Sequence, residues 1–208
     1  MSRAHLIRSD QHPYHVTARC YNQDPFPVSR SEAWAIMLEE LSRGERNFCL
    51  QVHAFVMMDN HFHLLCETPK ANLDQIMHSF QKNVAVKILS KAERKGHLWG
   101  GRYHWSIIMN HAYYFQAYRY IFQNPVRAGL SPNVEKYPYS TLRAHVPFAL
   151  HDKLGIQMGG EAGLLNWLNQ ELSLEDQRLI KLGLRKNQFD VNKKKMKLFE
   201  RLERPKSD

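Results

Sequence analysis

Apolar and polar residues alternate between positions 48 and 67, which is typical of β-strands with one buried face. Asp59 and Asn60 divide this segment, and both are good turn residues. Before the turn, every second residue is apolar: Phe48, Leu50, Val52, Ala54, Val56 and Met58. After it, Phe62, Leu64 and Cys66 continue the alternation on one face of the second strand. The pattern predicts a β-hairpin over 48–67.

Three other segments carry apolar residues at helical spacing. The first follows Ser29, which forms a capping box with the glutamate three residues later, and is expected to stop near Gly44. The second has Asn72 as its expected N-cap and then an apolar stripe: Leu73, Ile76, Met77, Phe80, Val84 and Ile88. The third begins after Asn110 and is expected to end near Pro125, because proline disfavours helix in the residue before it.

Residues 13–21 and 104–109 are rich in β-forming residues and add one strand before the first helix and one after the second. This order of elements indicates a ferredoxin-like, or split β-α-β, α+β fold, with helices on one face of an antiparallel sheet, for residues 1–145. From 146 onward glycines loosen the chain, and short helical patterns lie around 164–172, 174–182 and 191–202. We expect residues 146–208 to form a small helical appendage with a basic end.

His61 and His63 flank Phe62 in the second strand of the predicted hairpin. Side chains alternate along a strand, so both imidazoles point to one face, with Cα atoms roughly 7 Å apart. Two imidazoles at that spacing are close enough to share a metal ion. The pattern is short, however, and two histidines on a half-exposed strand can equally be ordinary surface residues.

The formal net charge of +9 and a pI near 9.5 favour a polyanionic partner, although a generically basic protein would carry the same charge. Nine tyrosines, ten phenylalanines and four tryptophans lie among the basic residues and offer faces on which unpaired bases can stack. The three scattered cysteines argue against a disulfide framework or a thiolate zinc site. With no apolar signal segment and no run long enough to span a membrane, we expect a cytoplasmic protein.

Tyr120 and Asn124 fall on one stripe of the third helix, at the rim of its apolar face. Taken singly, they could be a core-edge tyrosine and a residue that ends a helix before proline. Together with the histidine pair they belong to a longer set of blocks: 13–17 (PYHVT), 60–65 (NHFHLL), 96–103 (GHLWGGRY), 120–130 (YIFQNPVRAGL) and 137–141 (YPYST). In this order and spacing, over roughly residues 12–145, the blocks resemble the REP-associated tyrosine transposases, which are single-tyrosine transposases of the HUH endonuclease superfamily.

The resemblance implies a metal-dependent enzyme that cleaves and rejoins single-stranded DNA at hairpin-flanked sites. His61 and His63 would hold Mg²⁺ or Mn²⁺, with Asn124 as a third ligand. Tyr120 would be the nucleophile and form a 5′-phosphotyrosine, with Tyr118 as its rival. A free phenol is only about 0.1% ionised at pH 7, so a nearby cation would assist it. Candidate contacts to the DNA backbone are Lys82, Lys87, Arg102, Arg119 and Arg127.

Asp59 stands where relatives often carry proline, which affects the turn but removes no expected ligand. Two other functions stay open: a non-catalytic nucleic-acid-binding domain on the same scaffold, and a histidine-ligated metallohydrolase for which Tyr120 is dispensable. The protein could act as a monomer or as a homodimer. The link 106–112 contains no glycine, which favours a tyrosine that acts in cis. Neither the DNA hairpin nor the role of residues 146–208 follows from the sequence.

Overall fold

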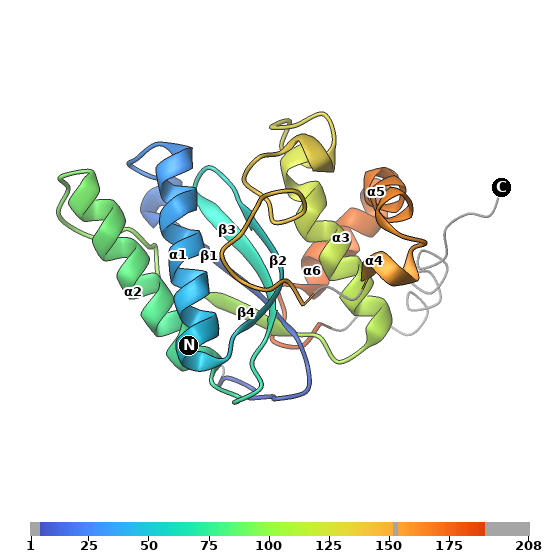
Figure 1. The fold of residues 1–208 in the computed structure, drawn as a ribbon, viewed down its shortest axis with the longest axis horizontal. Coiled ribbons are helices and arrows are strands. Elements are labelled where there is room, and N and C mark those ends of the chain that lie inside the picture. Colours follow the sequence, from blue (N-terminus) through green and yellow to red (C-terminus); the bar gives the residue numbers. More distant parts are fainter. Residues whose placement is uncertain (1–4, 152–153, 190–208) are drawn as a thin grey trace.

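A computed structural model of the chain describes residues 5–151 and 154–189. Within these residues the chain is built around a four-stranded antiparallel sheet in the order β2–β3–β1–β4 (Figure 1). The strands are β1 (Tyr14–Arg19), β2 (Gln51–Met57), β3 (His61–Glu67) and β4 (His104–Ile107). This is the split β-α-β order, and the predicted α+β, ferredoxin-like class is confirmed. It places β3, which carries both histidines, between β2 and β1.

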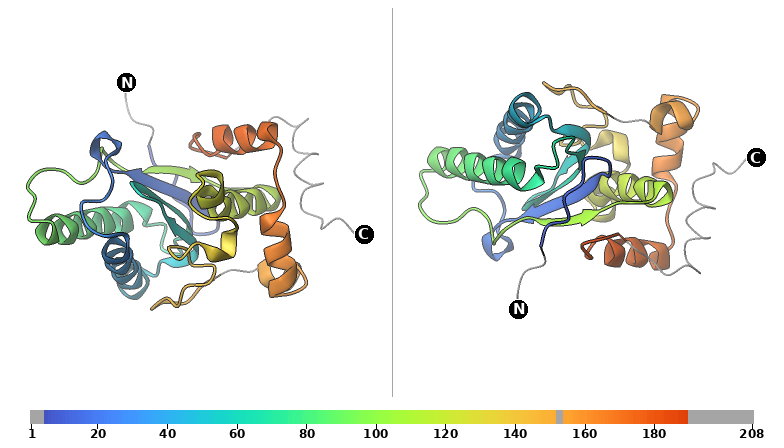
Figure 2. Two further views of the ribbon diagram at one scale, coloured as in Figure 1. Left: turned by 90° about the horizontal axis from the view of Figure 1, so that it is seen from above. Right: turned by 90° about the horizontal axis from the view of Figure 1, so that it is seen from below.

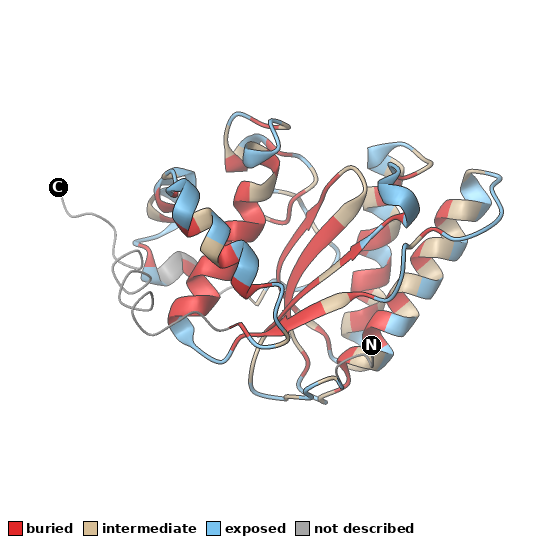
Figure 3. Cartoon of the chain, turned by 180° about the vertical axis from the view of Figure 1, so that it is seen from behind, coloured by how far each residue is buried: buried red, intermediate tan, exposed pale blue. Residues whose placement is uncertain are grey.

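Helices cover both faces of the sheet (Figure 2). Helices α1 (Arg30–Phe48) and α2 (Leu73–Lys91) lie on one face, where a core forms around Phe55 and Phe62. Helix α3 (His111–Arg127) lies on the other face and packs on Leu65. The two crossover helices α1 and α2 therefore share one face, as predicted, and α3, which follows the last strand, covers the opposite face. With both faces covered, the strands are buried along most of their length (Figure 3).

The alternation predicted along β2 is interrupted by a bulge. The register with β3 shifts between Val52 and Ala54, so the residues on either side of His53 turn to opposite faces. Val52 packs in the core beneath α1 and α2, whereas Ala54 and Val56 pack in the core beneath α3. The single apolar face predicted for 48–58 is therefore divided between two cores, because both sides of this strand are buried.

Two helices run further than the sequence predicts. Helix α1 continues through Gly44 to Phe48, and Gly44 does not adopt the positive φ that would end it; the glycine leaves space for a neighbour, since a Cβ on it would lie 3.0 Å from Leu50 Cδ2. Helix α3 continues past Pro125 to Arg127. The missing proline N–H leaves the Ile121 carbonyl without its usual donor; the Asn124 side-chain nitrogen lies 3.5 Å from that carbonyl and donates to the Tyr120 carbonyl at 2.8 Å.

The C-terminal part forms the helices α4 (Leu154–Gln157), α5 (Glu161–Asn169) and α6 (Leu174–Gly183), and short 3₁₀ turns lie at Tyr21–Gln23 and Val134–Lys136. Residues of α5 and α6, such as Trp167 and Ile180, share one hydrophobic core with α3. The helix predicted at 191–202 lies outside the described residues. Within the described ones, no helix is both long and apolar enough to cross a membrane.

Candidate active site

The two histidines of β3 lie together on the face of the sheet that α3 covers. Their ring centroids are 5.1 Å apart, with the ring planes at 81°. A third imidazole joins them from β1, because His15 stacks on His63 and its Nε2 lies 2.9 Å from His63 Nδ1. The His-x-His pair is thus part of a three-histidine cluster, of which only two members stand out in the sequence.

Burial keeps this cluster uncharged. It lowers the pKa of His15 to about 3 and that of His61 to about 4, and it holds the pKa of His63 well below its usual value. Neutral imidazole is the form that binds metal. The Nδ1 of His61 pairs with Asn60 Oδ1 at 2.7 Å and the Nδ1 of His63 pairs with His15, so each ring keeps its Nε2 for another ligand.

Helix α3 brings Tyr120 against the histidines of the same chain. The Tyr120 ring centroid lies 5.7 Å from that of His63 and 6.3 Å from that of His15. Burial raises the pKa of its phenol, and the charges of Arg127, Arg185 and Arg19 act against that rise. The Arg127 guanidinium also lies over the ring, 5.0 Å from its centroid. A candidate nucleophile, candidate metal ligands and positive charge therefore meet at one place.

Asn124 and Tyr118 do not join this cluster. The side-chain nitrogen of Asn124 is tied to the carbonyls of its own helix, and Asn124 is not among the residues that line the cleft beside the histidines. Tyr118 is buried between Tyr114 and Phe122. In the part of the chain that the structure describes, no three His, Cys, Asp or Glu side chains are placed to hold one metal ion; this includes the three-histidine cluster, in which His15 Nε2 faces His63 Nδ1.

An open cleft of about 630 Å³ gives solvent access to His61, His63 and Tyr120. The loop at 100–102 forms one side of it and contributes Arg102, one of the predicted DNA contacts. The other side comes from the C-terminal part of the chain, with Lys181 and Arg185. These two cations escaped the sequence analysis, because nothing in a short amphipathic helix tells where in the fold it packs.

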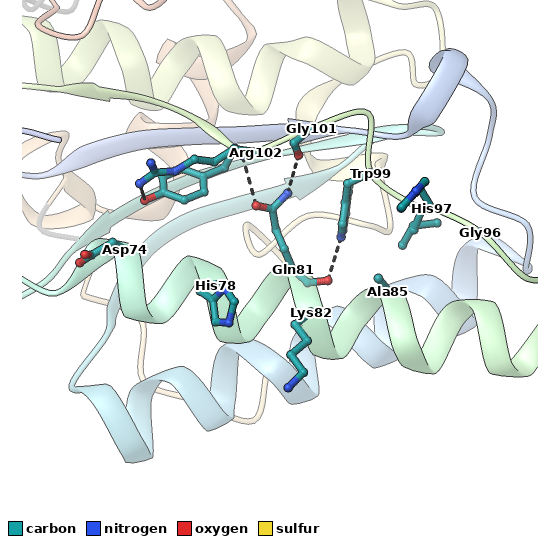
Figure 4. A pocket seen from close by; sticks show the side chains of 12 residues that line it. Asp74, His78, Gln81, Lys82, Ala85, Gly96, His97, Trp99, Gly101 and Arg102 are labelled. Carbon is teal, nitrogen blue, oxygen red and sulfur yellow. Dashed lines mark hydrogen bonds between the residues drawn. The ribbon is translucent and has the colours of Figure 1, made fainter. Parts of the chain in front are cut away.

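A second groove, of about 580 Å³, runs between α2 and the loop 96–103 and shares Gly101 and Arg102 with the cleft (Figure 4). Gln81 holds the loop against the helix: its side chain donates to the Gly101 carbonyl and accepts from the Tyr103 N–H, and its carbonyl accepts from Trp99 Nε1. Lys82, another predicted DNA contact, lines this groove. Lys82 and Arg102 are both exposed.

Two other predicted DNA contacts are engaged elsewhere. Lys87 Nζ lies 2.7 Å from carboxylate oxygens of both Glu39 and Glu40, between α2 and α1. Arg119 is only 2% exposed; its guanidinium stacks on Trp167 and donates to the Gln170 carbonyl. Lys87 and Arg119 therefore join helices to one another, and the expectation that they contact DNA does not fit the structure. A basic residue looks the same in sequence whether it faces solvent or a carboxylate.

Comparisons with known proteins point to one family. The family model described as "Transposase IS200 like" matches residues 9–124, a stretch that includes the histidine pair, Tyr120 and Asn124. A solved REP-associated tyrosine transposase bound to a REP hairpin is 15% identical, covers 84% of this chain and 93% of its own, and has a TM-score of 0.60. A protein from Deinococcus radiodurans R1, described as a transposase, is 19% identical over 58% of this chain and 94% of its own, with a TM-score of 0.38. No curated protein matches the chain.

Proposed function

Because the chain belongs to the family of IS200-like transposases, we propose that it cleaves and rejoins single-stranded DNA through a covalent bond to Tyr120. The observation that carries this proposal is the position of the Tyr120 ring, 5.7 Å from that of His63 and open to the same cleft. The charges of Arg127, Arg185 and Arg19 act on the Tyr120 phenol and favour the ionised form.

The donor set suits a divalent cation, Mg²⁺ or Mn²⁺. His61 and His63 are neutral, lie side by side and have their Nε2 atoms left for a ligand. Asn124 stays the proposed third ligand through its carboxamide oxygen, but it does not line the cleft in this structure, so its side chain would have to turn away from the Tyr120 carbonyl to reach the cation. A cation held there would supply positive charge to the scissile phosphate, as a Lewis acid does in phosphoryl transfer.

Tyr120 is the proposed nucleophile. Its phenolic oxygen forms a bond to phosphorus while the bond from phosphorus to the 3′ oxygen breaks, which yields a 5′-phosphotyrosine and a free 3′-hydroxyl. The phenolic proton is lost and the leaving 3′ oxygen gains one, so the step needs no oxidant and no nucleotide cofactor. An unperturbed phenol at pH 7 lies roughly 4 kcal/mol from its ionised form, and the charges of Arg127 and Arg185 favour that form.

The proposed substrate is a single DNA strand next to a folded repeat hairpin. The solved relative with the higher TM-score was bound to a REP hairpin, and the cleft and groove of this chain are rich in basic side chains. Arg102, Arg127 and Lys82 are the proposed contacts to the DNA backbone. Tyr120 and His63 of one chain already lie together, which supports cleavage by a monomer in cis and does not require a homodimer.

The test is incubation with end-labelled DNA hairpins from repeats that flank the gene, in Mn²⁺, Mg²⁺ or EDTA. Denaturing gels then reveal whether DNA stays attached to protein. The proposal expects an adduct that needs metal and that disappears in Tyr120→Phe and in His61→Ala. Tyr118→Phe is the matched control, because it is the same change two residues away, and it should keep the adduct.

Each rival function has its own result in this assay. Cleavage that persists in Tyr120→Phe would point to a metallohydrolase that uses His61 and His63 without a covalent step. Tight binding of DNA with no cleavage in any metal would point to a binding domain. Loss of the adduct in Tyr118→Phe, with Tyr120→Phe still active, would move the nucleophile by half a turn and refute the assignment.

A further inference from the structure

The C-terminal part of the chain reaches the cleft although the family match ends at residue 124. Residues after α6 run beside β4: the Ile107 N–H donates to the Asn187 carbonyl at 2.9 Å, and the Phe189 N–H donates to the Ile107 carbonyl at 2.8 Å. His104 Nε2 lies 2.8 Å from the Arg185 carbonyl. The backbone of this segment is therefore fixed along the edge of the sheet that adjoins the cleft.

Two cations of this segment face the cleft. Lys181 lies in the last turn of α6 and Arg185 two residues beyond its end; both line the cleft, and both are exposed. Arg178 is on the same helix and also exposed, but it lines a different hollow with Leu174 and Leu182. The charge of Arg185 is one of those that act on the Tyr120 hydroxyl.

The cleft carries positive charge that the protein does not neutralise. Arg19 and Arg102 line it opposite Lys181 and Arg185, and no acidic residue is found among its described lining residues. In the part of the chain that the structure describes, none of these four cations is paired with a carboxylate. Clustered cations repel one another, so the cleft gains from an anionic ligand.

We propose that Lys181 and Arg185 bind phosphates of the single DNA strand that lies in the cleft, with Arg185 at the phosphate next to Tyr120. This inference rests on the proposed function and adds a ligand-binding role to residues 146–189. The guanidinium of Arg185 can donate two parallel hydrogen bonds to one phosphate, and the Lys181 ammonium can act on the neighbouring phosphate. The strand would then be held between the β-sheet and the C-terminal segment.

Salt-dependent binding tests the proposal without any need for cleavage. A fluorescent oligothymidylate is titrated with protein in EDTA at several salt concentrations, and the logarithm of the binding constant is plotted against the logarithm of salt. Each phosphate contact to a single strand contributes about 0.7 to the slope. Arg185→Gln and Lys181→Gln should each flatten the slope by about 0.7, whereas the matched control Arg178→Gln should leave it unchanged.

Two further variants and outcomes make the result decisive. Arg185→Lys keeps the charge and should keep the slope; because the segment is anchored through the Arg185 carbonyl, none of these changes should lower the melting temperature. Slopes of Arg185→Gln and Lys181→Gln equal to that of the wild type would overturn the inference. If the variants show the expected slope changes but the wild-type protein never forms a DNA adduct, the proposed function is refuted and this binding site is still supported.

Discussion

His15 is the residue whose replacement should separate metal binding from folding. It is 2% exposed, it stacks on His63 at 5.2 Å, and its Nε2 pairs with His63 Nδ1 at 2.9 Å. A partner on the far nitrogen of a metal-binding histidine fixes the orientation and tautomer of the ring. His15→Phe keeps a flat, somewhat larger ring in the stack and removes both ring nitrogens, and with them this hydrogen bond.

Two opposing terms decide the effect on stability. The change leaves the buried His63 Nδ1 without its partner, which costs about 1–3 kcal/mol. It also removes His15 Nδ1, which is buried with no hydrogen-bond partner among the described residues and carries a cost of the same order. The net change in unfolding free energy should therefore stay within about 1 kcal/mol, or roughly 2–4 °C in melting temperature.

Metal affinity should respond much more strongly. Loss of such an outer partner typically lowers affinity by about 10- to 100-fold, or about 1.4–2.7 kcal/mol. Calorimetric titration with Mn²⁺ measures the affinity, and a thermal melt measures the stability. The matched control is His111→Phe, which changes an exposed histidine at the start of α3 that packs on Phe115. Unchanged Mn²⁺ affinity in His15→Phe, at unchanged stability, would refute the positioning role of His15.

Other expected outcomes separate DNA contacts from structural residues. Lys82→Gln should flatten the salt dependence of binding by about 0.7, but only for strands long enough to leave the cleft and enter the second groove. Lys87→Gln should leave that slope unchanged and lower the unfolding free energy in urea by about 1–2 kcal/mol, because it weakens the pairing of the buried Glu40 carboxylate. Arg119→Met should likewise spare the slope and cost about 1 kcal/mol of stability through the lost hydrogen bond to the chain after α5. Gly44→Ala should lower the melting temperature despite the better helix propensity of alanine, because its Cβ would lie 3.0 Å from Leu50 Cδ2; a rise would contradict this.

Local patterns were sufficient to predict the order of elements and the sheet class, because an amphipathic period or a turn residue determines the backbone of only the few residues around it. They failed where a distant contact decides. Helix α1 runs through Gly44, against which Leu50 packs, and α3 runs past Pro125, where the Asn124 side chain donates to the Tyr120 carbonyl. The sequence also does not show on which face of the sheet α3 packs. Strands that are buried on both faces are apolar on both faces, so their pattern does not distinguish one face from the other.

The candidate site was predictable to the extent that its chemistry is carried by a motif. His61, His63 and Tyr120 were predicted as one site from the family resemblance, and the structure brings these three side chains together. Their roles, like that of Asn124, stay predictions. His15 was missed as a site residue because its place depends on the pairing of β1 with β3. That pairing sets His63 opposite Thr17, and His15, two residues before Thr17 on the same face of β1, then reaches His63. Lys181 and Arg185 were missed because their place depends on how α6 packs.

The helix that carries Tyr120 is held by residues inside the family match, which covers 9–124, and by residues beyond it. From within it, α3 follows β4 after a short link, and its N-cap Asn110 binds the Ala112 N–H at 2.8 Å. From beyond it, Gln123 donates to the carbonyls of Leu168 and Gln170 at 2.8 and 2.9 Å, at the end of α5. A nucleophile must be held within a fraction of an ångström to act, so if Tyr120 is the nucleophile, as proposed, Gln123→Ala should slow adduct formation because it frees α3 from the end of α5. The family match ends at residue 124, whereas the contacts that hold α3 and the edge strand β4 extend to Phe189.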